Sequence, residues 1–162
     1  MKSMVLSLLV DNNPGVLARV ASLFSRRGYN IESISAGVTN DPKFTRITVA
    51  VCGDDRILEQ IRNQINKLVE VRKIIELENS DSVCRELVLV KVMADKKDKR
   101  DIIAIADVFR AKIVDVGPDS VIIELTGTQN KLDAFLNLLG DFEVIEMVRT
   151  GVTGLERGMQ AL

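Results

Sequence analysis

The sequence predicts an α+β protein made of two tandem βαββαβ units. Short apolar runs alternate with amphipathic helical segments, and the same order of segments occurs twice. One long polar break, Glu78–Ser82, separates the two copies. A chain of 162 residues is long enough for two small domains. We therefore expect domains at residues 1–78 and 84–162, joined by a linker at 79–83, and each folded as a ferredoxin-like sandwich.

The first half opens with a strand that leads into a helix. The run Met4–Val10 is almost wholly apolar and ends in the breaker cluster Asp11–Gly15. Asn12 or Asn13 can cap the following helix, and Pro14 suits its first turn, where its missing N–H costs nothing. Five apolar residues then recur at the spacing of one helix face. They are Val16, Leu17, Val20, Leu23 and Phe24.

Gly28 ends this first helix, and a strand follows it. The alternation over Tyr29–Val38 changes phase between Ile31 and Ile34, which predicts a β-bulge. A turn at Asn40–Pro42 then leads to the rest of this half. The remaining predicted elements are a strand over residues 46–51, a helix over 57–68 capped by Asp54 or Asp55, and a strand over Val71–Leu77.

The second half repeats the pattern after the polar break. The predicted elements are a strand at Leu87–Met93, a helix at Asp98–Arg110, strands at Lys112–Val116 and Val121–Leu125, a helix at Thr128–Leu139 and a strand at Phe142–Val148. Several predicted strands are apolar on both faces, although a strand with one face in water should be polar at every second position. We infer that these surfaces are buried against another copy, another domain or a partner, and expect a homodimer or larger assembly. The alternative is a monomer whose two domains cover each other.

The composition excludes many kinds of function. The chain has no His, so it lacks a His base, a Ser-His or Cys-His nucleophile pair and a His metal ligand. Lys and Arg total 22 against 23 Asp and Glu, which gives no field for binding nucleic acid or an anionic membrane. Cys52 and Cys84 lack metal-site or redox spacing, and we expect reduced core thiols in a cytoplasmic protein. We predict no catalytic residues and no metal site, membrane span or signal peptide.

The loop before the first helix is the best candidate for a binding site. A helix N-terminus offers free N–H groups and partial positive charge, which suit a carboxylate. Gly15 allows a ligand close to the backbone, and the Asn12 amide offers both a donor and an acceptor to an amino-acid head group. The same spacing also fits an ordinary Asx cap. Asn30, just after the first helix, is a second candidate polar contact, although it also fits a simple turn.

Longer motifs along the whole chain resemble those of one known family. In the first half they are Asn12-x-Pro14-Gly15-Val16-Leu17, the run Phe24–Ser33, and Asp41-Pro42-x-x-Thr45-Arg46-x-Thr48. In the second half they are Arg85-Glu86-Leu87, Lys91-Val92, Phe109-Arg110-x-Lys112–Val116, Thr126-Gly127, Lys131–Phe135 and Arg149-Thr150-Gly151. The sequence thus resembles the small, regulatory subunit of acetolactate synthase (acetohydroxyacid synthase). Its first half resembles an ACT domain, an amino-acid-sensing module.

The resemblance implies a regulatory function. In the family, a catalytic large subunit uses thiamine diphosphate, a divalent metal and FAD in branched-chain amino-acid synthesis, and this chain itself needs no cofactor. The small subunit raises that activity and confers feedback inhibition, usually by valine. ACT domains pair side by side and bind the amino acid between them. The implied effector-binding residues are Asn12, Gly15, Val16 and Leu17 from one copy, and Asn30 and Ile31 from the other.

Two departures and three other readings accompany this resemblance. Ala111 stands where many relatives have Gly, and Pro14 replaces a small polar residue. Gly15-Val16-x-x-Arg19 is similar to the phosphate loop of acylphosphatase but lacks its upstream glycines. An RNA-binding fold would need stacking aromatics where the central strands are aliphatic. A free-standing amino-acid sensor that acts on another partner is the stronger alternative.

Overall fold

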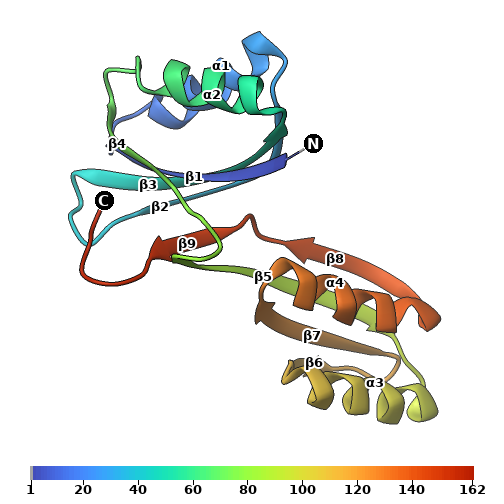
Figure 1. The fold of residues 1–162 in the computed structure, drawn as a ribbon. Helices are drawn as coiled ribbons and strands as arrows, with labels where there is room; N and C mark the ends of the chain where they lie inside the picture. Colours follow the sequence, from blue (N-terminus) through green and yellow to red (C-terminus); the bar gives the residue numbers. More distant parts are fainter. Residues whose placement is uncertain (1) are drawn as a thin grey trace. The chain divides into compact units, whose positions relative to one another are not determined.

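The computed structural model describes residues 2–162 and has the predicted α+β fold, with two units that each contain an antiparallel sheet and two helices (Figure 1). One unit comprises the chain up to Cys84 together with Gly151–Leu162, and the other comprises Arg85–Thr150. The last twelve residues, which the sequence pattern places with the second domain, therefore group with the first unit.

The first unit has the element order βαββαβ. Its elements are β1 (Lys2–Asp11), α1 (Val16–Arg27), β2 (Asn30–Val38), β3 (Phe44–Gly53), α2 (Asp55–Ile65) and β4 (Val71–Glu76). The strand order is β2-β3-β1-β4, with every pairing antiparallel. The register of β2 on β3 shifts between Ile31 and Ser33, so the predicted bulge is confirmed. Asp54 caps α2, as the sequence predicts, because its carboxylate accepts from the Ile57 N–H at 2.8 Å.

The helices of the first unit cover one face of its sheet (Figure 1). Alternate residues of β1 and β3 point toward them, since side chains along a strand alternate between faces. Leu6, Leu8, Ile47, Val49 and Val51 are buried there. The facing stripes of the helices are Val16, Val20 and Phe24 on α1 and Leu58, Ile61 and Ile65 on α2. The apolar residues that recur with a period of 3.6 in the helices and of two in the strands therefore pack together in one aliphatic core.

The second unit repeats this topology. Its elements are β5 (Ser82–Met93), α3 (Lys96–Phe109), β6 (Lys112–Val116), β7 (Ser120–Gly127), α4 (Gln129–Leu138) followed by a 3₁₀ turn (Leu139–Asp141), and β8 (Val144–Arg149). The strand order β6-β7-β5-β8 matches that of the first unit. Helix α3 begins two residues earlier than expected, because Asp95 is its N-cap.

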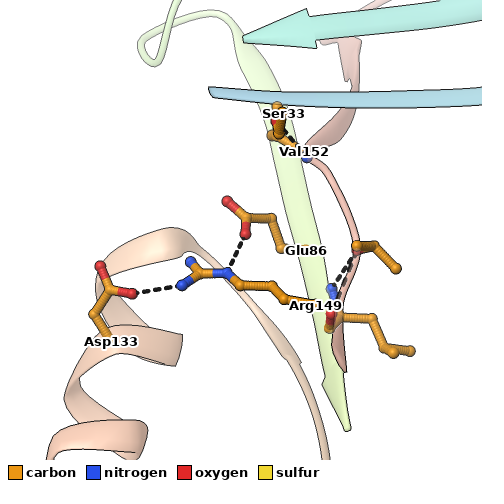
Figure 2. A network of polar contacts seen from close by, with 7 residues as sticks. Ser33, Glu86, Asp133, Arg149 and Val152 are labelled. Atoms are coloured by element: carbon orange, nitrogen blue, oxygen red, sulfur yellow. Dashed lines mark hydrogen bonds and ion pairs between the residues drawn. The ribbon is translucent and has the colours of Figure 1, made fainter. Parts of the chain in front are cut away.

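The final strand, β9 (Thr153–Glu156), pairs with β5 and was not predicted from the sequence. Its four residues are too few to show alternation. Just before it, the chain lies on the second face of the first unit's sheet, where Ser7, Thr48 and Ala50 are buried. The Val152 N–H donates to Ser33 Oγ at 3.3 Å (Figure 2).

Gly151 lies so close to β2 that a side chain would not fit. A Cβ at this position would stand 2.8 Å from the carbonyl oxygen of Ile34. Further along, the Lys73 Nζ on β4 donates to the carbonyl oxygen of Ala161 at 3.1 Å. The C-terminal segment thus covers part of the sheet face that the sequence leaves without polar alternation.

An arginine in the second unit ties the end of β8 to its neighbours (Figure 2). Arg149 Nε donates to Glu86 Oε2 on β5 at 2.6 Å, and Nη1 donates to Asp133 Oδ1 on α4 at 2.8 Å. Burial works to lower the pKa of Arg149, but the hydrogen bonds to Asp133 and Glu86 raise it. The guanidinium therefore stays charged and fixes the strand end to both a strand and a helix.

Candidate functional site

The loop between β1 and α1 ends in a residue that must be glycine-like. Gly15 has φ +83° and is the N-cap of α1. This left-handed conformation costs an ordinary side chain about 1–2 kcal/mol. The helix consequently begins at Val16, so Pro14 lies before its first turn rather than inside it. The expectation that Asn12 or Asn13 caps the helix is wrong, because no side chain caps α1.

Asn12 instead ties the loop to the turn between β2 and β3. Its Nδ2 donates to the carbonyl oxygen of Pro42 at 2.9 Å, and Thr45 Oγ1 donates to its Oδ1 at 3.1 Å. Its backbone N–H donates to the Lys43 carbonyl oxygen at 2.8 Å. An amide has two donor hydrogens and two acceptor lone pairs, so Asn12 keeps one of each for a ligand.

The N-terminus of α1 is therefore electrostatically open. The Val16 N–H donates to the Asn13 carbonyl oxygen at 3.4 Å, but the N–H groups of Leu17 and Ala18 have no acceptor within the helix and carry partial positive charge. Val16 is buried beneath them, whereas Leu17 is 49% exposed. A carboxylate at these N–H groups would have an apolar side chain beside it, which is the arrangement that an aliphatic amino acid needs.

Two acidic residues next to this loop already have arginine partners. Arg72 donates from Nε and Nη2 to the two carboxylate oxygens of Asp11, at 2.7 and 2.6 Å. The hydrogen bond with Arg72 lowers the pKa of Asp11, so Asp11 stays ionised. Arg19 forms an ion pair with Glu70. Because both negative charges are compensated, they do not repel a carboxylate at the helix start.

One chain does not bring all the predicted site residues together. Asn30 is exposed at the start of β2, where it pairs with Cys52 near one end of β3, and Ile31 follows it half-buried. At the other end of β3, Phe44 pairs with Asp11, immediately before the candidate loop. Those two ends of the strand lie about 27 Å apart, at ~3.4 Å per residue. Asn30 and Ile31 are therefore far from the loop of their own chain.

Sequence reasoning missed two contributors to the loop. Thr45 and the carbonyl group of Pro42 hold the Asn12 amide, and neither was singled out as a site residue. Both belong to the motif Asp41-Pro42-x-x-Thr45, so the signal was present without a geometric role. Among residues 2–162, no three Cys, Asp or Glu side chains gather as a metal site would require. No helix in that range is long and apolar enough to cross a membrane.

Comparisons with known proteins agree along the whole chain. Residues 85–158 match a family described as "Small subunit of acetolactate synthase", and residues 6–73 match one described as "AHAS small subunit-like ACT domain". The chain is 48% identical to the probable acetolactate synthase small subunit of Methanothermobacter thermautotrophicus, over 98% of this chain and 95% of that protein. It is 44% identical to the acetolactate synthase isozyme 3 small subunit of Salmonella typhimurium, over 95% of each chain.

A solved structure supports the same relationship. The crystal structure of the acetolactate synthase small subunit from Thermotoga maritima has a TM-score of 0.90 to this chain at 42% identity. The likeness covers 99% of this chain and 100% of that one, so it extends through both units and the C-terminal segment.

Proposed function

The chain belongs to the acetolactate synthase small subunit family, the regulatory subunits of that enzyme, and from this premise we propose how it regulates. It raises the activity of a catalytic large subunit and confers feedback inhibition by a branched-chain amino acid, namely valine. It has no catalytic activity of its own. Thiamine diphosphate, a divalent metal and FAD belong to the catalytic partner, and the assembly works in the cytoplasm.

The open N-terminus of α1 is the observation that carries this proposal. The valine carboxylate accepts hydrogen bonds from the first N–H groups of the helix, where Gly15 leaves room for it. The Asn12 amide, held by Thr45, contacts the amino-acid head group. The exposed Leu17 side chain contacts the aliphatic part of the ligand. This arrangement selects a small apolar amino acid through its carboxylate and amino groups at one end and its aliphatic side chain at the other.

A second copy of the chain supplies Asn30 and Ile31. β2 lies at the edge of its sheet, and the end of β2 is beside the candidate loop, since Val38 pairs with Thr45. If two copies pair antiparallel through β2, the start of β2 in one copy lies beside the end of β2 in the other. Asn30 and Ile31 of the partner then approach the loop of the first copy. The same pairing covers Ile34 and Val38, which are 38% and 60% exposed.

The proposal is tested by adding the purified chain to its cognate catalytic subunit. We expect the turnover of pyruvate to rise with the amount of small subunit and to reach a plateau. Valine should then inhibit the activated complex more strongly than the catalytic subunit alone. If pyruvate turnover and its response to valine are the same with and without this chain, the proposed regulation is wrong.

A further inference from the structure

A groove runs between the two helices of the first unit. One hollow of about 400 Å³ is lined mainly by α1, with Gln64 and Leu68 on the α2 side. An adjoining hollow of about 560 Å³ is lined by the C-terminal end of α1, by Tyr29 and by α2. Arg26 and Arg27 line both hollows, so the two form one continuous surface feature, the α1–α2 groove.

The groove is strongly basic on a chain whose net charge is −1. Helix α1 carries three arginines and no acidic residue in its twelve positions. Arg19 is partnered by Glu70. Arg26 and Arg27 are exposed, and neither forms an ion pair within residues 2–162. Two exposed guanidinium groups therefore line the groove without an ion-pair partner among these residues.

The lining between these charges is apolar. Leu23 and Leu68 are half-buried and pack against the aliphatic core, so they form a fixed surface in the groove. The ring of Tyr29 packs edge-on against Phe24, at 6.4 Å between ring centroids, and this contact holds it in place. A small inorganic anion would bind the arginines and leave the leucines exposed. A peptide segment with both carboxylates and apolar side chains would cover both kinds of surface.

We propose that the α1–α2 groove docks an acidic, partly apolar segment of the catalytic subunit. This inference rests on the proposed function, since it names the surface through which the small subunit reaches its partner. The arginines lie in the last turn of α1, and the candidate effector loop lies at its first turn, about 18 Å away. One rigid helix therefore joins the effector site to the docking surface.

The test is a titration of the cognate catalytic subunit with charge variants of the full chain. Arg26→Glu with Arg27→Glu reverses both groove charges, and we expect about a tenfold higher half-saturating concentration of small subunit. Adding salt should weaken the wild type and narrow the difference, because salt screens exposed charges. Arg26→Lys with Arg27→Lys keeps the charge, and its activation curve should stay close to that of wild type.

Matched controls separate the groove from general electrostatics. Lys97→Glu with Arg100→Glu, on exposed positions of α3, makes the same change of net charge in the other unit and should activate like wild type. Glutamate at the C-terminal end of α1 opposes the helix dipole. If that variant fails to fold, Arg26→Gln with Arg27→Gln decides the question, with an expected loss of about threefold.

Three results would overturn the inference. One is an activation curve for the Arg26 and Arg27 variants that coincides with that of wild type. A second is an equal loss in the α3 control, which would make the effect one of net charge. A third is saturable displacement of the catalytic subunit by inorganic phosphate at constant ionic strength, which would indicate a small-anion site. If wild type itself does not activate, the proposed function fails instead, and the two failures are distinguishable.

Discussion

The two units enter their first helix in different ways, although their topology is the same. In the first unit, Asn12–Gly15 connect β1 to α1, and the N-cap is a glycine in the left-handed conformation. In the second unit, only Ala94 and Asp95 connect β5 to α3. The Asp95 carboxylate accepts from the N–H groups of Lys97 and Asp98 at 2.7 and 2.8 Å. The Asp98 side chain in turn accepts from the Asp95 N–H and completes a capping box.

This difference leaves the N-terminus of α1 without a side-chain partner and occupies that of α3 with one. In α3 the protein's own carboxylate occupies the helix N-terminus, and the backbone hydrogen bonds from Asp98 and Lys97 lower the pKa of Asp95. In α1 no side chain takes that place. Under the proposed function, a carboxylate from outside binds at α1, whereas at α3 it would have to displace Asp95. A side chain of the protein occupies the N-terminus of α3, whereas no side chain occupies the N-terminus of α1.

The largest expected effect comes from closing the first unit in the same way. Gly15→Asp puts a carboxylate at the N-cap of α1, where it competes with the valine carboxylate by sterics and by like charge. Losing one charge-assisted hydrogen bond costs about 1.5–3 kcal/mol, so the inhibitory concentration of valine should rise at least ~tenfold. Activation of the catalytic subunit should remain. The measurement is synthase activity against valine concentration at saturating small subunit.

Gly15→Asn is the matched control for this variant. Its side chain has nearly the same size and carries no charge, and Asn tolerates the left-handed conformation better than most residues. A Cβ at position 15 meets nothing within 4 Å, but the φ of +83° strains any side chain there, so both variants should fold with a similar small loss of stability. Asn should raise the inhibitory concentration less than Asp does. An inhibition curve for Gly15→Asp that coincides with wild type would remove the site from this loop. Joint loss of inhibition and activation would place the damage in the fold or the partner interface.

A smaller expected effect tests whether the candidate effector site is formed by residues from two copies of the chain. Asn12→Ala and Asn30→Ala should each weaken inhibition by valine, since each removes a polar contact. Mixing the two variants in equal amounts forms mixed dimers in which one of the two sites has both asparagines. Random mixing makes about half of the dimers mixed, so about a quarter of all sites are intact. Part of the sensitivity to valine should return. If the mixture behaves like the average of its components, both asparagines act within one chain.

Much of the fold could be predicted from the hydrophobic periodicity. The residues whose burial stabilises each helix or strand are apolar, and they recur at the period of that element. The bulge after Ile31, the cap at Asp54 and the helix end at Gly28 all follow from local signals and are confirmed. The start of α1 does not follow from a local signal, since the φ of Gly15 depends on how the loop meets the turn at Pro42. β9 was missed because its pairing with β5 is set by the return of the chain, and four residues carry no period.

The candidate site was only partly accessible to the same reasoning. Asn12, Gly15 and Asn30 were identified from their types and places in the sequence, and Val16, Leu17 and Ile31 from the family resemblance. Local patterns say nothing about the distance between them. The strand register shows that they lie at opposite ends of one sheet, which follows only after β3 is paired on both sides.

A stability measurement tests the Asp95 cap at the start of α3 in the second unit. Asp95→Ala leaves the N–H groups of Lys97 and Asp98 without their acceptor, so the thermal midpoint should fall by about 3 °C. Inhibition by valine should not change, because the substitution lies in the other unit. The comparison uses thermal unfolding followed by circular dichroism, beside an activity titration. A shift in the valine response would mean that the second unit also takes part in sensing.

The smallest expected effect is the pH dependence of that cap. The folded-state pKa of Asp95 is below its ordinary value of 3.8, so the folded protein favours the charged carboxylate and the unfolded chain binds a proton more readily. The contribution of the charge to stability is therefore fully present well above pH 3.8 and is lost as the pH falls through the folded-state pKa. Asp95→Asn keeps a capping side chain without the charge. Wild type should exceed Asp95→Asn in thermal midpoint by about 1–2 °C at neutral pH, and the difference should shrink as the pH falls below the ordinary pKa of 3.8 and vanish once the folded-state carboxyl is protonated, because a protonated Asp resembles Asn. A difference that stays constant across this range would show that the charge of Asp95 contributes nothing and that hydrogen-bond geometry alone closes the helix.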